Sequence, residues 1–169
     1  TVRIRNLSTV DFGFIGKLEI FWDYDNYPTI KDVDQLPDSG KIYKHVYPKF
    51  FNQALKPVRI VVRAFSGGSC SDDENSQVSL LGSPAVQFDS IPGICLDATP
   101  RQITQTKYTD VTGIKSGDSL FTGKGVNTKG LYTPLNAGAG TYVLQYTFTA
   151  SNGCKDTVSK SIIVWPRPT

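Results

Sequence analysis

The sequence has few of the residues that catalytic and metal-binding sites require. It contains one histidine, His45, three cysteines and no methionine in 169 residues. A single histidine leaves a zinc site poorly supplied with ligands, and no serine lies on the sharp turn that exposes a nucleophile. The pattern therefore predicts a protein that is not an enzyme, with no catalytic residue, no cofactor and no firm metal site.

Long apolar runs and basic clusters are also missing. No run approaches the roughly 18 apolar residues that cross a bilayer. The net charge of +3 comes from 18 basic and 15 acidic residues spread along the chain, whereas nucleic-acid-binding surfaces concentrate their basic residues. We expect no membrane insertion by this segment and no nucleic-acid partner.

Apolar side chains at helical spacing are absent from every window of about 11 to 18 residues, and short alternating segments take their place. The predicted fold class is all-β. The expected strands are Val2–Asn6, Lys17–Tyr24, Lys41–Tyr47, Val58–Phe65, Gln77–Leu81, Ala85–Phe88, Gln102–Thr106, Ser119–Phe121, Gly130–Thr133, Thr141–Ala150 and Thr157–Val164.

A strand–turn–cysteine–strand unit occurs twice. Its cysteines, Cys70 and Cys154, are 154 − 70 = 84 positions apart, and carboxylates follow each of them at Asp72 and Asp156. A repeat of this length is typical of a β-sandwich module rather than a solenoid turn. We expect two tandem antiparallel sandwich domains, residues 1–82 and 83–169.

The beginning of the first domain differs from that of the second. It has no counterpart of the strand expected at Ala85–Phe88, and the sequence opens within a strand pattern at Thr1–Arg5, without a signal peptide. We interpret the chain as a fragment of a longer protein whose first domain is truncated at its N-terminal strand.

The cysteines suggest a disulfide. Cys95 and Cys154 enclose most of the second domain, and a bond closing such a loop contributes about 4 kcal/mol in the chain-entropy model. It would indicate an oxidising compartment. The alternative is two buried free thiols in a cytosolic protein. We expect Cys70 to be unpaired, or to pair between molecules or with a cysteine before Thr1.

Two segments of the first domain resemble the PKD domain, an immunoglobulin-like sandwich of bacterial surface proteins. Lys17–Asn26, which contains Trp22-Asp23-Tyr24-Asp25-Asn26, is similar to the family's strand ending in Trp-Asp-Phe-Gly-Asp-Gly. His45-Val46-Tyr47-Pro48 is similar to its His-x-Tyr signature. The chain departs from the family at Tyr24-Asp25-Asn26, where the glycine-bearing turn is replaced.

The second domain resembles the PKD-like or immunoglobulin-like repeats of giant Bacteroidetes surface proteins, which often end in a gliding-motility or type IX sorting domain. The similarity runs from Cys95-Leu96-Asp97-Ala98 through Gly123–Val126 and Gly138–Tyr142 to Ser151-Asn152-Gly153-Cys154. It implies an extracellular, non-catalytic structural or adhesive spacer whose partners are neighbouring domains, glycans or other surface proteins. The alternative is a carbohydrate-binding accessory module of a secreted polysaccharide-degrading enzyme.

Two groups of residues are candidate binding sites. Asp23, Asp25, Asp32 and Asp34 supply the carboxylate oxygens that a calcium ion requires, although their spacing does not fit an EF-hand, and a solvated loop is the alternative. Trp22, Tyr24 and Tyr27 could stack on a sugar, but a tryptophan at the end of an alternating strand is more often a core residue. Capping of the domain end by the neighbouring aromatic residues is favoured over ligand binding.

The glycines have a simpler interpretation. Gly117 and Gly123-Lys124-Gly125 differ from a phosphate-binding loop in spacing and in the residue after the lysine. Gly123, Gly125, Gly138 and Gly140 are expected at positions of positive φ or of close backbone approach.

Overall fold

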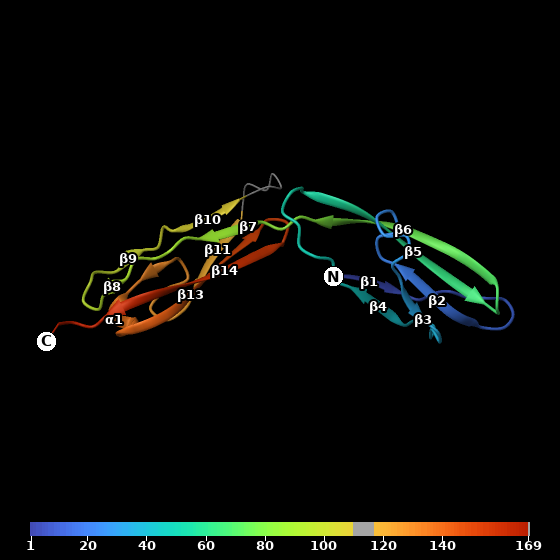
Figure 1. Cartoon of the computed structure of the whole chain (residues 1–169), viewed down its shortest axis with the longest axis horizontal. Coiled ribbons are helices and arrows are strands. Elements are labelled where there is room, and N and C mark those ends of the chain that lie inside the picture. Colours follow the sequence, from blue (N-terminus) through green and yellow to red (C-terminus); the bar gives the residue numbers. More distant parts are fainter. Residues whose placement is uncertain (110–116, 169) are drawn as a thin grey trace. The chain divides into compact units, whose positions relative to one another are not determined.

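The computed structural model describes residues 1–109 and 117–168, and these residues form mainly β-strands in several sheets, nearly all of them antiparallel (Figure 1). The chain divides into two compact units. Unit 1 comprises Thr1–Lys49 and Leu55–Leu80, and unit 2 comprises Phe50–Ala54 and Leu81–Thr169. The segment Phe50–Ala54 joins unit 2 through backbone hydrogen bonds from Gly82 to Ala54 and from Ser83 to Phe50.

Unit 1 contains a two-stranded and a four-stranded sheet. The small sheet pairs β1 with β4, and the large sheet has the order β3-β2-β5-β6. The strand bounds are β1 (Val2–Arg5), β2 (Ile15–Phe21), β3 (Asp32–Asp34), β4 (Ile42–His45), β5 (Leu55–Ser66) and β6 (Cys70–Leu81).

The core of unit 1 follows the alternation of β2 and β5. Ile20, Trp22 and Ile60 form a buried cluster against which partly buried side chains of β1 and β4, such as Ile4 and Tyr43, also pack. Side chains from both sheets therefore enclose this core, as period-2 patterning requires.

Unit 2 has a four-stranded sheet of order β11-β13-β14-β8 and two small sheets, β10-β7 and β12-β9. Its elements are β7 (Ala85–Phe88), β8 (Ile94–Cys95), β9 (Arg101–Gln102), β10 (Thr106–Thr109), β11 (Gly117–Thr122), β12 (Leu131–Tyr132), α1 (Pro134–Ala137), β13 (Gly140–Ala150) and β14 (Lys155–Trp165). The pairing of β8 with β14 is parallel, with Ile94 opposite Val164 and Cys95 opposite Trp165. No helix among the described residues is long and apolar enough to cross a membrane.

A separate core fills unit 2. Leu144, Tyr146 and Phe148 alternate on the inner face of β13, and Ile162 and Val164 do so on β14. The alternation read from the sequence therefore predicts the buried face correctly. Gly123, Gly125, Gly138 and Gly140 all have positive φ, as expected.

The predicted Cys95–Cys154 disulfide is wrong. All three cysteines are free, and Cys70 is exposed. Cys95 lies opposite Trp165 at the last residue of β14, whereas Cys154 directly precedes the first residue, Lys155. At about 3.3 Å per residue the length of β14 separates the two thiols by roughly 30 Å, and a disulfide requires Cα atoms within about 7 Å. An oxidising compartment therefore loses the support that this bond would have given it.

Candidate functional site

The first pair of candidate calcium ligands is engaged by other side chains. The Nδ2 group of Asn26 donates to both carboxylate oxygens of Asp23, at 2.8 and 3.0 Å, and Lys56 Nζ lies 3.8 Å from Asp23 Oδ2. Arg59 donates from Nε and Nη2 to Asp25 Oδ1, at 2.8 and 2.6 Å. Each carboxylate is therefore oriented toward a donor from its own surroundings.

The second pair, on β3, is engaged in the same way. Asp32 accepts a hydrogen bond from the indole Nε1 of Trp22 at 2.7 Å. Asp34 accepts from Lys41 Nζ at 2.6 Å, from Tyr43 Oη at 2.7 Å and from a backbone N–H. Within residues 1–109 and 117–168, no three His, Cys, Asp or Glu side chains are grouped so that they could hold a metal ion. The calcium hypothesis remains a prediction without a described ligand cluster.

The contacts of Asp34 predict a pH dependence. The hydrogen bond from Lys41, followed by that from Tyr43, lowers the pKa of Asp34 from 3.8 to about 2. Because the pKa is lower in the folded state, the carboxylate stabilises unit 1 fully above pH 3.8, and that stabilisation is lost as the pH falls toward 2. We expect Asp34→Asn to flatten the decline of the unit 1 melting temperature between pH 4 and 2. The control Asp11→Asn, elsewhere in unit 1, should retain the wild-type slope, and equal slopes in all three proteins would contradict this assignment.

Trp22 is a core residue rather than a binding platform. It is 6% exposed, and its indole stacks on the His45 imidazole with ring centroids 5.0 Å apart. The Tyr47 ring contacts His45 edge-on, and the Tyr47 hydroxyl donates to the Trp22 backbone carbonyl. Burial raises the pKa of Tyr47, and the nearby charge of Asp23 adds to this effect. The single histidine of the chain is thus packed between two aromatic rings.

The other two candidate aromatic residues differ in exposure. Tyr24 is half-buried, with its ring edge-to-face with Phe21 at 5.3 Å and under the Arg59 guanidinium at 4.9 Å. Tyr27 is 55% exposed. Of the three residues considered for sugar stacking, only Tyr27 presents most of its side chain to solvent.

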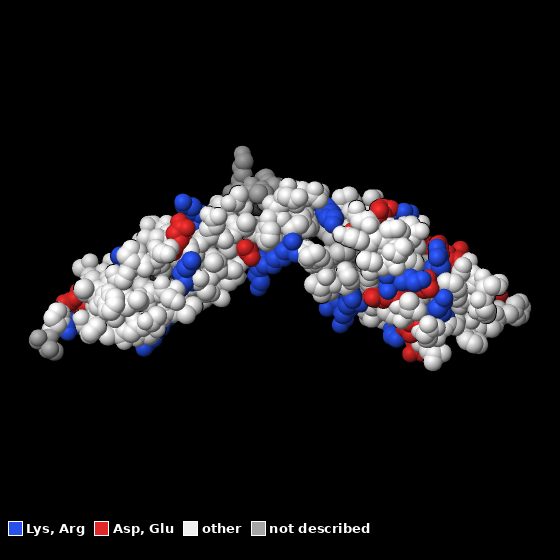
Figure 2. Space-filling model, viewed as in Figure 1, with Lys and Arg blue, Asp and Glu red and all other residues white. Residues whose placement is uncertain are grey.

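Ion pairs on the large sheet of unit 1 were not predicted from the sequence. Glu19 is buried, and Lys17 and Lys31 lie 3.1 and 2.7 Å from its two oxygens. The hydrogen bond from Lys31 is the main cause of its lowered pKa. Arg63 makes a bidentate pair with Asp73 at 2.6 and 2.8 Å, which lowers the pKa of Asp73. Figure 2 shows basic and acidic side chains side by side on unit 1. Lys17 and Glu19 are two positions apart on one strand, so their ion pair could have been predicted from the sequence. The pairs of Glu19 with Lys31 and of Arg63 with Asp73 depend on how the strands are arranged.

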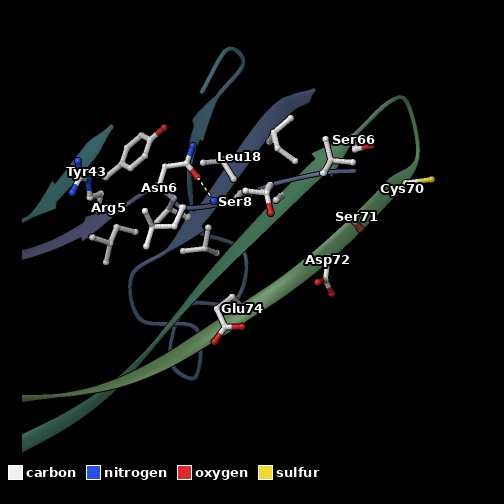
Figure 3. A pocket seen from close by; sticks show the side chains of 18 residues that line it. Arg5, Asn6, Ser8, Leu18, Tyr43, Ser66, Cys70, Ser71, Asp72 and Glu74 are labelled. Carbon is white, nitrogen blue, oxygen red and sulfur yellow. Dashed lines mark hydrogen bonds between the residues drawn. The ribbon is translucent and has the colours of Figure 1, made fainter. Parts of the chain in front are cut away.

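A groove of about 740 Å³ lies in unit 1 (Figure 3). Apolar side chains of β1, β2 and β5 line it, namely Ile4, Ile15, Leu18, Ile20, Val62 and Ala64. Figure 3 shows Asp72 and Glu74 extending from β6 on one side of this groove and Arg5, Asn6 and Tyr43 on the other. An apolar floor next to strand edges suits a polypeptide or another apolar ligand better than a small charged substrate.

Polar contacts fix one side of the groove. The Asn6 side chain donates to the Asp38 carbonyl at 2.9 Å and accepts from the Ser8 backbone N–H at 3.0 Å. Cys70, Asp72 and Glu74 are exposed on the other side. The sequence signal for this groove was the missing counterpart of Ala85–Phe88, but the side chains that line it could not be identified from the pattern.

No family model and no curated protein matches this chain.

Proposed function

We propose that the chain forms two immunoglobulin-like, PKD-like β-sandwiches that act as a non-catalytic extracellular spacer in a multi-domain bacterial surface protein. The proposal is supported by the two separate cores and by the similarity of Lys17–Asn26 and His45–Pro48 to PKD segments. Its partners would be the neighbouring domains of the same polypeptide. The observation that carries it best is the way in which β8 pairs with β14.

The β8–β14 pair is placed to resist tension. β8 lies near the N-terminal side of unit 2, β14 is its last strand, and the two strands are parallel. A pull on the two ends of unit 2 displaces them in opposite directions along their length. The backbone hydrogen bonds that hold this pair are then loaded together rather than one after another. They include the bond from the N–H of Leu96, the residue after β8, to the Trp165 carbonyl at 2.9 Å. A spacer that transmits force would benefit from this arrangement.

Single-molecule stretching of the full chain from its two ends tests this proposal. Leu96→Pro removes the N–H donor to Trp165, whereas the matched control Leu96→Ala removes most of the side chain and keeps the donor. We expect the rupture force of unit 2 to fall clearly further in Leu96→Pro than in Leu96→Ala. Equal rupture forces in the wild type and both variants would count against a mechanical role for this pair.

The alternative function, a carbohydrate-binding accessory module, has narrower support. It would depend on Tyr27, because Trp22 is buried and the Tyr24 ring is contacted by Phe21 and Arg59. Loss of glycan binding in a folded Tyr27→Ala variant would favour the accessory-module function over the spacer.

A further inference from the structure

In unit 2, the segment Ala85–Cys95 closes one side of the core. It runs beside β14, because the Val86 N–H donates to Asp156 Oδ2 at 3.2 Å and Ile94 lies opposite Val164 further along. The two contacts follow the same order along both segments, so Ala85–Cys95 runs in the same direction as β14, with backbone pairing at Ile94–Cys95. Its side chains Phe88, Ile91 and Ile94 are buried in the core.

In unit 1, β6 occupies the position that β14 has in unit 2. The repeat offset of 84 places Asp72 at the position of Asp156, and both strands pair with the preceding long strand. Among the described residues, no strand pairs with the other edge of β6. Asp72 and Glu74 are therefore exposed beside the groove, whereas Asp156 and Val158 on β14 are half-buried.

The residues after β1 also lack a strand partner that their counterparts in unit 2 have. In unit 2, β10 precedes β11 and pairs with β7 alone. In unit 1, the stretch Leu7–Val10 precedes β2 but forms no strand, and Leu7 is 73% exposed. A segment with strand-forming residues and an unpaired edge is suited to receive an added strand.

We infer that the unit 1 groove binds one extended polypeptide strand with the chemistry of Ala85–Ile94. The occupant has apolar side chains at alternate positions and lies parallel to β6 and antiparallel to Leu7–Val10. Its apolar side chains contact the half-buried Ile4, Val62 and Ala64 that line the groove. One of its backbone N–H groups donates to Asp72, as Val86 does to Asp156. This strand-accepting site is independent of the spacer function.

The test uses a synthetic peptide with the sequence of residues 83–94, a scrambled peptide of the same composition, and the full chain. Bound peptide should slow alkylation of Cys70, which lines the groove, by fivefold or more, while Cys95 reacts as before. Backbone amides of Asp72–Ser76 should exchange more slowly, and the melting temperature of unit 1 should rise with peptide concentration. The scrambled peptide should produce none of these changes.

Two variants and a fusion make the test decisive. Asp72→Ala should weaken binding about tenfold or more, because a hydrogen bond to a carboxylate is lost, and the control Asp97→Asn in unit 2 should not. Joining residues 83–94 to Thr1 through a flexible linker raises the effective concentration to the millimolar range and should protect Cys70 fully. The inference is overturned if neither the peptide nor the fusion protects Cys70. It is also overturned if sedimentation shows that the chain dimerises and that the second copy is what protects Cys70.

Discussion

Replacing Trp22 with alanine should unfold unit 1 or bring it close to unfolding, while unit 2 keeps its wild-type transition. Removal of a buried tryptophan costs about 3 to 5 kcal/mol, and Trp22 is 6% exposed within a small cluster that includes Ile20 and Ile60. For a unit of this size, that cost corresponds to a fall in melting temperature of roughly 12 to 40 °C. Calorimetry with hydrogen exchange can follow the two units separately.

The matched control is Tyr27→Ala. It removes an aromatic side chain of similar size from a position that is 55% exposed, and surface substitutions of this kind usually change stability by about 0.5 kcal/mol or less. A wild-type unit 1 transition in Trp22→Ala would mean that Trp22 is not part of the core. A simultaneous loss of unit 2 would contradict separate cores.

The long strands could be predicted from the sequence because alternation depends on local geometry alone. The short ones could not: β3 and β8 were not expected, and the expected strand Gln102–Thr106 is divided between β9 and β10. Leu144, Tyr146 and Phe148 point to one face of any strand that contains them, whatever its neighbours are. Their burial in the structure therefore agrees with the pattern. The same reasoning identified Trp22 at the end of its alternating strand as a core residue.

The disulfide could not be judged in this way, because the distance between Cys95 and Cys154 depends on which strand lies next to which. β8 is only two residues long and pairs with the far end of β14. Neither its length nor its partner leaves a signal in the sequence. The separation of the cysteines along the chain carried no information about the direction of that pairing.

The four aspartates illustrate a related limit. Closeness in sequence suggested a shared cation. The side chains that engage Asp23 and Asp25 include Lys56 and Arg59, which come from the distant strand β5, whereas Lys41 engages Asp34 from seven residues away. The local sequence shows how many carboxylates are present. It does not show which basic side chains the fold places beside them, where a calcium ion would otherwise bind.

Gly125→Ala should destabilise unit 2 by about 2 to 5 kcal/mol. Gly125 has φ +83°, a conformation that costs an L-residue about 1 to 2 kcal/mol. An added Cβ would also lie 2.7 Å from the Ala137 Cβ and 3.2 Å from the Tyr132 ring, and overpacking of this kind costs about 1 to 3 kcal/mol. Thermal or urea unfolding of unit 2 measures the sum of the conformational cost and the packing cost.

Gly153→Ala measures the conformational part of that effect alone. Gly153 has nearly the same φ, +82°, but an added Cβ there would meet no atom within 4 Å. The conformational cost is therefore shared by the two variants, and the difference between their free energies of unfolding reports the contact with Ala137 and Tyr132. If both variants lose the same stability, the loop at Gly125 moves away from α1 without cost. If Gly125→Ala is the more damaging, as we expect, this glycine is required by packing, which favours the structural turn predicted for Gly123-Lys124-Gly125 over a phosphate-binding loop.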